Sequence, residues 1–285
     1  MSDDGAHGIT VIAFLGSVFS PYYARSRDGD PLNHCAVNVV LYGRPQRWAM
    51  TERGRGALAR DARTLTIGPS GLSWDGSALT IRIDEVTAPL PSRLSGTVRV
   101  RPEGLTPGPF VLDAEGQHRW WPLAPSSRIE VAFTRPALAW QGHAYFDTND
   151  GDVALERSFT RWTWARAPLS DGAAILYDVV RRDGSRQDLS LRFDAAGRPR
   201  AIDPPVPAAL PPTLWRLPRA TRSDDGAARV LRRFEDAPFY SRSLLSARLC
   251  GEDVRPVHEA LDLDRFSHPL VRLMLPFRMP RAMGR

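Results

Sequence analysis

The sequence of 285 residues contains no lysine, so all 38 of its basic residues are arginine. These arginines are spread among 32 acidic residues, and no run of five like charges occurs. A groove for nucleic acid needs basic side chains gathered in a stripe, so we predict no nucleic-acid partner. The net charge of +6 instead favours a weak attraction to an anionic membrane surface.

Cysteine and long apolar runs are also scarce. The two cysteines, Cys35 and Cys250, belong to no Cys-x-x-Cys motif, which predicts a reduced, cytoplasmic compartment. The first residues, MSDDGAHG, are acidic where a signal peptide carries positive charge. The apolar run ITVIAFLGSVF has about eleven residues and is too short to span a bilayer. We therefore expect a protein that is neither secreted nor integral to a membrane.

The familiar motifs for cofactors, metals and nucleophilic catalysis are missing. The segment from Asp147 resembles a calcium loop, but Asp152 stands where the loop needs glycine, and Ser158 where it needs glutamate. The six histidines form neither an HExxH motif nor a cluster with zinc-ligand spacing. The sequence also lacks a P-loop, a Gly-x-Gly-x-x-Gly motif and a Gly-x-Ser-x-Gly elbow. We therefore predict chemistry that uses no metal and no cofactor.

Short strand-like segments dominate what the sequence does contain. They are rich in β-branched or aromatic residues and are bounded by turn residues. The clearest are residues 36–42, 64–68, 79–86, 95–102, 127–134, 142–149, 173–184 and 187–197. Asp-Gly pairs at 75–76 and 183–184 predict hairpin turns. Helical signals are few and short, the best being residues 51–62 and 256–266. This pattern predicts an all-β protein of the sandwich or barrel type.

The strand-rich pattern restarts near Arg135-Pro136, which predicts one domain over residues 1–135 and another over 136–285. The proline-rich segment PPVPAALPP, residues 204–212, should be a stiff, extended excursion. The tail from His268 contains no acid, and its prolines exclude one long helix. Its arginines are Arg272, Arg278, Arg281 and Arg285. Two interpretations of the tail stay open: a strap packed on a barrel, or an apolar-basic segment lying on a membrane surface.

Aromatic and titratable residues are concentrated between Gln117 and Asp152. Residues two apart in a strand share a face, so Trp120 should lie on the same face as His118. By the same argument, Asp147 should share a face with Tyr145 and His143. Further downstream, Trp162 and Trp164 form another such pair, and Trp121 follows Trp120. If these faces line an enclosed interior, that interior holds an acid surrounded by aromatic rings.

Such an interior suits the protonation of an alkene. Burial of Asp147 against aromatic rings would raise its pKa and keep its proton near neutral pH. Protonation of a trisubstituted alkene gives a tertiary carbocation, which a desolvated aromatic face can stabilise by ~2 kcal/mol or more. A water held by His118 could then attack, with the imidazole accepting a proton.

Each of these residues also has a plainer interpretation. Asp147 could cap a hairpin turn, and the tryptophans could be ordinary core side chains. Tyr145 could be a buried tyrosine with one satisfied hydroxyl. Lone histidines are seldom catalytic. The spacing therefore permits alkene hydration without requiring it.

Eight segments, in order along most of residues 9–268, resemble the carotenoid 1,2-hydratases, or hydroxyneurosporene synthases, of photosynthetic purple bacteria. The segments are AFLGSVFSPYYARSR, NHCAVNVVLYG, WAMTERG, LTIGPSGLSWDG, HRWWPLAP, GHAYFDTNDGD, RWTWARAPL and PFYSRSLL. The resemblance implies two lipocalin-like, calycin-type β-barrel domains in tandem. It also implies cofactor-free addition of water to the terminal C1–C2 double bond of acyclic carotenes, with neurosporene and lycopene as substrates.

The family's functional pattern is His-x-Trp followed by Tyr-x-Asp. Here these positions are His118 and Trp120, then Tyr145 and Asp147, so the resemblance predicts catalytic roles for all four, with Asp147 as the proton donor. Substrate contacts are predicted for a second group, namely His143, Trp121, Trp162 and Trp164.

Two alternatives to the hydratase stay open. A lipocalin-like barrel could carry a carotenoid or another isoprenoid without turnover. The same acid could instead start a terpenoid cyclisation or isomerisation that ends in proton loss. Because a long polyene resides in the bilayer, we also expect a cytoplasmic protein that is peripherally associated with the inner or intracytoplasmic membrane.

Overall fold

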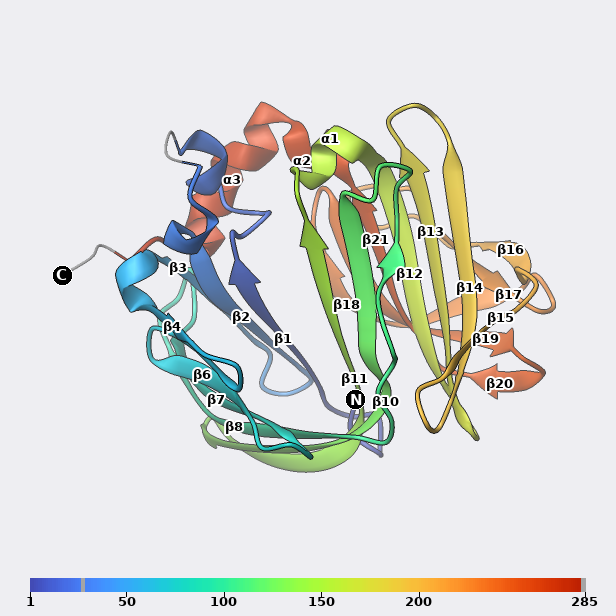
Figure 1. Ribbon diagram of the computed structural model, residues 1–285, viewed down its shortest axis with the longest axis horizontal. Coiled ribbons are helices and arrows are strands. Elements are labelled where there is room, and N and C mark those ends of the chain that lie inside the picture. The colour runs from blue at the N-terminus through green and yellow to red at the C-terminus, as the bar shows by residue number, and fades with distance from the viewer. Residues whose placement is uncertain (27–28, 283–285) are drawn as a thin grey trace. The chain divides into compact units, whose positions relative to one another are not determined.

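The computed structural model describes residues 1–26 and 29–282 (Figure 1). Arg27, at the end of the first family-like segment, and the last three residues of the tail, Arg285 included, lie outside the described residues. The described chain consists mainly of antiparallel strands joined in two eight-stranded sheets and two smaller ones, which confirms the predicted all-β class. Within the described ranges, no helix combines the length and the apolar character needed to cross a membrane.

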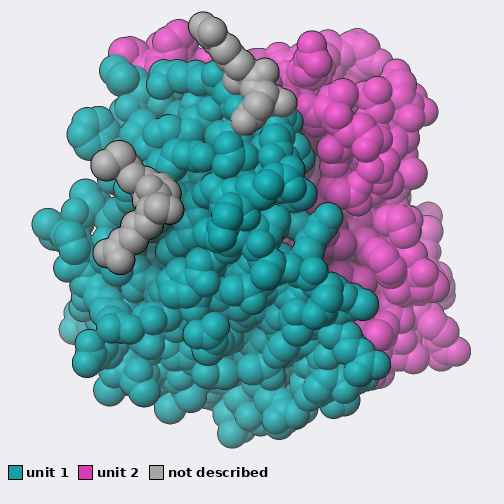
Figure 2. Space-filling view, turned by 60° about the vertical axis from the view of Figure 1, so that its left-hand side comes forward, with its two compact units in different colours: residues 1–102, 127–144, 272–285 teal, residues 103–126, 145–271 magenta. Residues whose placement is uncertain are grey.

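The chain divides into two compact units, each assembled from separate segments (Figure 2). Unit 1 contains residues 1–102, 127–144 and 272–285, and unit 2 contains residues 103–126 and 145–271. The two long strands β10 and β11 carry residues of both units. These units do not follow the sequence division at Arg135-Pro136, and that division stays a prediction.

Unit 1 contains a three-stranded antiparallel sheet and most of the first eight-stranded sheet. The smaller sheet has the order β1 (Gly8–Leu15), β2 (Cys35–Tyr42) and β3 (Arg47–Arg53). The larger has the order β11 (Ala137–Gly151), β10 (His118–Arg135), β8 (Arg93–Pro102), β7 (Leu79–Val86), β6 (Ser70–Trp74), β5 (Thr64–Ile67) and β4 (Leu58–Arg60), with β9 (Phe110–Val111) beside β10. Strand β2 is buried along its whole length, and β3 lies against β7.

Unit 2 is built on the second eight-stranded sheet. Its order is β15 (Pro199–Ala201), β14 (Arg186–Asp194), β13 (Gly172–Arg181), β12 (Phe159–Leu169), β21 (Val257–Asp262), β19 (Tyr240–Leu249) and β18 (Ala228–Asp236), with β20 (Glu252–Val254) beside β19. The proline-rich segment supplies β16 (Val206–Ala209), which pairs only with β17 (Ala220–Ser223) in a two-stranded sheet. This agrees with the predicted extended excursion.

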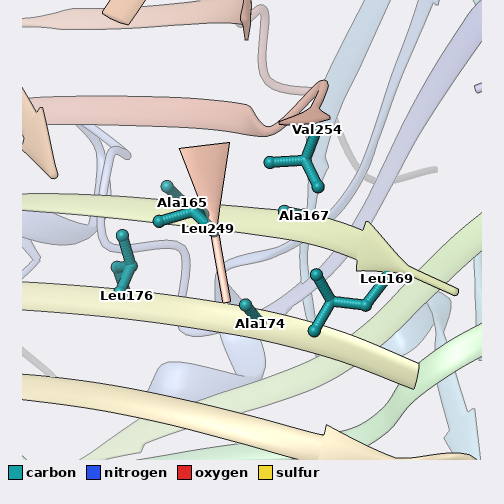
Figure 3. Packing of buried hydrophobic residues seen from close by; sticks show 7 residues of the cluster. All are labelled: Ala165, Ala167, Leu169, Ala174, Leu176, Leu249 and Val254. Atoms are coloured by element: carbon teal, nitrogen blue, oxygen red, sulfur yellow. The ribbon is translucent and has the colours of Figure 1, made fainter. Parts of the chain in front are cut away.

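The two faces of β12 have different side chains, as the twofold alternation of a strand requires. Figure 3 shows one face, where Ala165, Ala167 and Leu169 pack with Leu176 of β13 and Leu249 of β19. The other face of β12 bears two tryptophans and a buried arginine, which belong to the candidate site described below.

The helix predicted over residues 51–62 was wrong, and the one predicted over residues 256–266 is present only at its end. Residues 51–62 form the end of β3, a 3-10 turn (Arg55–Ala57) and β4. Two glycines in this segment lower helix propensity, and pairing of β4 with β5 overrides what remains. Most of residues 256–266 forms β21, and only α2 (Leu263–Ser267) is helical. Helix α2 begins where the Asp262 carboxylate accepts a hydrogen bond from the backbone amide of Arg265.

Two further helices are present in the described chain. Helix α1 (Leu155–Ser158) is one turn between β11 and β12, and α3 (Pro269–Arg278) is a ten-residue helix in the tail. Two further 3-10 turns span Tyr23–Arg25 and Pro31–Asn33. The tail therefore contains a ten-residue helix that includes Pro276, and the choice between a strap and a membrane-surface segment stays a prediction.

Candidate active site

Trp120, on β10, connects the two key residues of β11. The Trp120 side chain is fully buried, and its indole N–H donates to the hydroxyl of Tyr145 at 3.0 Å and to Oδ2 of Asp147 at 3.1 Å. Strands β10 and β11 are hydrogen-bonded neighbours, and Tyr145 and Asp147 point to the same face because they are two residues apart. The predicted grouping of Trp120, Tyr145 and Asp147 is therefore what the strand pairing produces.

The Asp147 carboxyl is partly desolvated and hydrogen-bonded. Desolvation is the largest influence on this group and raises its pKa to about 6. The negative charge of Glu259 acts in the same direction, whereas hydrogen bonds from Tyr145, Trp120 and Asn149 stabilise the carboxylate and act in the opposite direction. The Asn149 amide donates to Oδ2 of Asp147 at 3.3 Å. A carboxyl group in this environment retains a protonated fraction near neutral pH.

Aromatic rings from β12 and β13 surround this hydrogen-bonded group. The Trp164 ring lies 5.1 Å from that of Tyr145, centroid to centroid. Tyr177 makes edge-to-face contacts with Trp120 at 5.3 Å and with Trp162 at 5.4 Å. These distances are those of favourable aromatic pairs. The predicted pair Trp162 and Trp164 therefore joins Trp120, Tyr145 and Asp147 in one cluster within unit 2.

Strand register explains why these rings meet. On β12, Trp162 and Trp164 share a face with Arg166, and Trp164 stands opposite Tyr177 of β13 on one side and Glu259 of β21 on the other. Arg166 is buried and donates from Nε to the carbonyl of Pro125 at 3.0 Å. Desolvation lowers the pKa of Arg166 to about 10, so its guanidinium remains charged at neutral pH.

His118 lies in a separate set of contacts. Its imidazole Nε2 is 2.9 Å from the Ser158 hydroxyl, and its ring packs 4.8 Å from that of Phe159. Among the described residues, Nδ1 is buried and has no hydrogen-bond partner. A Cβ atom at Gly151 would lie 2.6 Å from Nδ1, so the absence of a side chain there admits the imidazole. Burial lowers the pKa of His118, which favours the neutral ring.

Two of the predicted substrate contacts lie elsewhere. Trp121 follows Trp120 in β10 and so faces the opposite side of the strand, where its indole N–H donates to the carbonyl of Thr106 at 3.0 Å. His143 belongs to unit 1, where its half-exposed ring lies 3.2 Å from a guanidinium nitrogen of Arg128 and 3.6 Å from Asp3. Substrate contact by either residue stays a prediction.

Sequence reasoning missed three side chains that border the cluster. Tyr177 is buried within a predicted strand. Glu259 lies in a segment that was predicted to be helical, and its partner Arg242 lies in a segment for which no element was predicted. A strand signal in the sequence was present for Tyr177, but the register that places it opposite Trp164 was not. In the part of the chain that the structure describes, no group of three or more His, Cys, Asp or Glu is placed to hold a metal ion.

Comparison with known proteins gives the family. A sequence profile described as "Carotenoid hydratase CrtC" matches residues 11–285. The chain belongs to the CrtC family of carotenoid hydratases. These enzymes are hydro-lyases.

Relatives within the CrtC family are similar over almost the entire chain. An acyclic carotenoid 1,2-hydratase of Thiocapsa roseopersicina is 53% identical over 100% of this chain and 72% of its own length. A protein of the same name from Rubrivivax gelatinosus is 48% identical over 99% of this chain and 71% of its own. The one from Cereibacter sphaeroides is 45% identical over 96% of this chain and 99% of its own.

Solved structures with low sequence identity share the fold of this CrtC family member. A protein of Nitrosomonas europaea described as an AttH candidate aligns with a TM-score of 0.58 and 14% identity, covering 92% of this chain and 88% of its own. A structure of CghA with Sch210972 aligns with a TM-score of 0.53 and 12% identity, covering 92% and 86%. Together with the antiparallel sheets, this likeness identifies the fold as lipocalin-like.

Proposed function

We propose that this chain adds water to the terminal C1–C2 double bond of acyclic carotenoids and that Asp147 is the proton donor. The observation that carries the proposal is the partly desolvated Asp147 carboxyl, bonded to Trp120 and Tyr145 within a cluster of aromatic rings. The names of the relatives from Thiocapsa and Rubrivivax support the same reaction. Neurosporene and lycopene are the substrates we propose.

The proposed reaction begins with transfer of the Asp147 proton to C2. The O–H bond breaks, the π electron pair of the alkene forms the new C2–H bond, and C1 becomes a tertiary cation. The oxygen of a water molecule then forms a bond to C1. The proton that this water loses passes to a base, and reprotonation of the carboxylate restores the acid. One water is consumed for each alcohol formed, and no oxidation or reduction takes place.

Several rings of the cluster are suited to the cation intermediate. Trp162, Trp164 and Tyr177 present aromatic surface beside the acid, and a desolvated ring can stabilise a cation by ~2 kcal/mol or more. General acid catalysis alone supplies roughly 10²–10⁴-fold in rate. Alkene protonation needs more than that, so we propose that fixed aromatic rings and exclusion of bulk water supply the rest.

For His118 we propose the role of holding or deprotonating the attacking water. The neutral imidazole that burial favours is the form that can accept a proton. Its contact with Ser158 fixes the ring, and Nδ1 has no hydrogen-bond partner among the described residues.

The test is pigment analysis in cells that make lycopene, comparing the wild-type chain with Asp147→Asn. We expect the wild type to produce 1-hydroxy carotenoid, labelled when the cells grow in heavy-oxygen water, and the variant to produce none. Asp150→Asn is the matched control, because Asp150 is exposed and paired with Arg119. Hydration by Asp147→Asn at the wild-type rate would refute the role of the acid.

The same experiment distinguishes the alternatives. Unchanged lycopene bound to the wild-type protein would indicate a carrier. A product of unchanged mass would indicate cyclisation or isomerisation, in which the cation loses a proton instead of gaining water.

We also propose that the protein contacts a membrane surface through α3. Four large apolar side chains follow helical spacing along this helix and are exposed by 65%, 61%, 49% and 74%, namely Leu270, Leu273, Met274 and Phe277. No acidic residue occurs after Asp264, so the local charge is basic and complements anionic lipid. The substrate gives the reason for such contact, because a long polyene dissolves in the bilayer.

The C-terminal end of α3 is held firmly within unit 1. Arg278 stacks over the Trp48 ring at 4.6 Å, and the buried Met279 packs against Ala36 and Met50. An exposed apolar stripe on an anchored helix is suited to insertion among lipid headgroups.

A further inference from the structure

A partly buried ion pair lies next to the aromatic cluster and has no part in the mechanism described so far. Glu259 of β21 accepts two hydrogen bonds from Arg242 of β19, at 3.0 Å from Nε and 2.6 Å from Nη2. Arg242 is buried, and its Nη1 also lies 3.3 Å from Glu235 of β18. Both carboxylates are partly exposed, and their pairing compensates for the desolvation of the buried Arg242 guanidinium.

Strand register places Glu259 beside the cluster. It stands directly opposite Trp164 of β12, and Trp164 stands opposite Tyr177 of β13, so the three side chains form one row on one face of the sheet. The row continues through Arg242 to Glu235 on the next two strands. Trp164 in turn packs against Tyr145, which hydrogen-bonds Asp147. Glu259 is therefore the carboxylate that the sheet brings toward the proposed acid.

We propose that Glu259, paired with Arg242, is a positioning residue that keeps the Asp147 carboxyl protonated for transfer to the alkene. This inference rests on the proposed function. Its physical basis is that a fixed negative charge disfavours a second one nearby, so the proton stays on the group with no cationic partner. Arg242 provides that partner for Glu259, whereas Asp147 has only neutral hydrogen-bond donors.

Electrostatics of the neighbouring groups agree with this assignment. Glu259 raises the pKa of Asp147, and both carboxyl groups raise the pKa of Tyr177, which desolvation already places well above its usual value. Arg166, on the same face of β12 as Trp164, interacts electrostatically with Tyr145. The groups facing Asp147 are Trp120, Tyr145, Asn149, Tyr177 and Glu259.

The experiment compares the pH dependence of kcat/KM for the wild type, Glu259→Gln and Glu235→Gln. In the wild type, activity should fall as the pH rises through the pKa of Asp147, about 6. Glu259→Gln should move this midpoint down by about one pH unit, giving roughly tenfold lower activity at pH 7–8 and less than about twofold at pH 5. Glu235→Gln, which leaves the pair of Arg242 and Glu259 intact, should keep the wild-type profile.

A second measurement does not depend on activity. The carboxyl ¹³C resonance of Asp147, assigned by its loss in Asp147→Asn, should titrate at lower pH in Glu259→Gln. Glu259→Asp, which keeps the charge, should restore most of the wild-type midpoint in both measurements. An unchanged midpoint in folded Glu259→Gln, with an active wild type and an inactive Asp147→Asn, would overturn this inference alone. Absence of hydration by the wild type would instead refute the proposed function.

Discussion

The surroundings of Asp147 change both its chemistry and its contribution to stability. Its hydrogen-bond donors are neutral, and desolvation outweighs them, so the folded protein holds a proton on this group at a pH where an unfolded chain would release it. A residue adapted to donate a proton therefore opposes folding when it ionises. This loss of folding free energy accompanies a carboxylic acid that can donate a proton near neutral pH.

We predict that Asp147→Asn stabilises the folded protein above pH 6. The pKa of this carboxyl rises from 3.8 to about 6 on folding, so wild-type stability declines as the pH rises from 3.8 to about 6 and stays lower above that. Asparagine removes this decline, and the free energy of unfolding should be on the order of 3 kcal/mol higher at pH 8 than in the wild type. Urea unfolding of both chains at pH 4 and pH 8 measures the difference. Equal stability of the two at pH 8 would show that the carboxyl is not desolvated.

At the scale of single elements, α3 shows most clearly that a helix can depend on tertiary contacts. Its sequence has prolines at both its first position and its eighth, yet it forms a helix, because proline is tolerated in the first turn and tertiary contacts hold the other end. The helix buries none of its own side chains completely and exposes four large apolar ones. An element of this kind is stable only because its flanks are anchored.

We predict that Phe277→Glu weakens binding to vesicles. Removal of one exposed ring and addition of a negative charge should lower partitioning onto anionic liposomes by roughly tenfold or more, measured by flotation. Leu90→Glu is the matched control, because Leu90 is 82% exposed but lies outside α3. Equal flotation of both variants would remove α3 from the membrane proposal. A concentration-dependent dimer that Phe277→Glu abolishes would show that a second copy covers this face.

At the scale of the whole molecule, the C-terminal tail is attached to strand β3, near the start of the sequence. Residues 272–285 belong to unit 1, and Arg281 there forms an ion pair with Glu52, 229 residues earlier in the sequence. Glu52 is fully buried and also lies 2.8 Å from the imidazole of His34. Backbone bonds from Glu52 to Pro280 and from Ala282 to Glu52 complete the attachment.

We predict that Arg281→Met destabilises unit 1, because it leaves the buried Glu52 carboxylate without its guanidinium partner. The free energy of unfolding should fall by about 3 kcal/mol. The double variant Arg281→Met/Glu52→Gln should recover most of this loss, because the charge that needs a partner is gone. Thermal or urea unfolding of the three chains measures both effects, and no loss in the single variant would contradict the attachment.

Much of the fold could be predicted from the sequence, because strand and turn signals are local. The predicted segments correspond to β2, β5, β7, β8, β10, β11, β13 and β14, and both Asp-Gly pairs lie in hairpin turns. The common face of Tyr145 and Asp147 likewise follows from the twofold alternation of a strand. The helix expected at residues 51–62 was wrong because pairing with a neighbouring strand outweighed a weak local preference.

Strand register and desolvation could not be obtained in this way. Trp164 stands opposite Tyr177, about 13 positions later in the sequence, and opposite Glu259, about 95 positions later. No local sequence pattern encodes this pairing. The proton on Asp147 depends in turn on how many atoms from β10, β12, β13 and β21 exclude water from it. The sequence therefore determined the acid and the tryptophans and tyrosine predicted around it. The tertiary structure decided that Glu259 acts on the acid and that Tyr177 packs against Trp120 and Trp162, because these contacts form only once distant strands have paired.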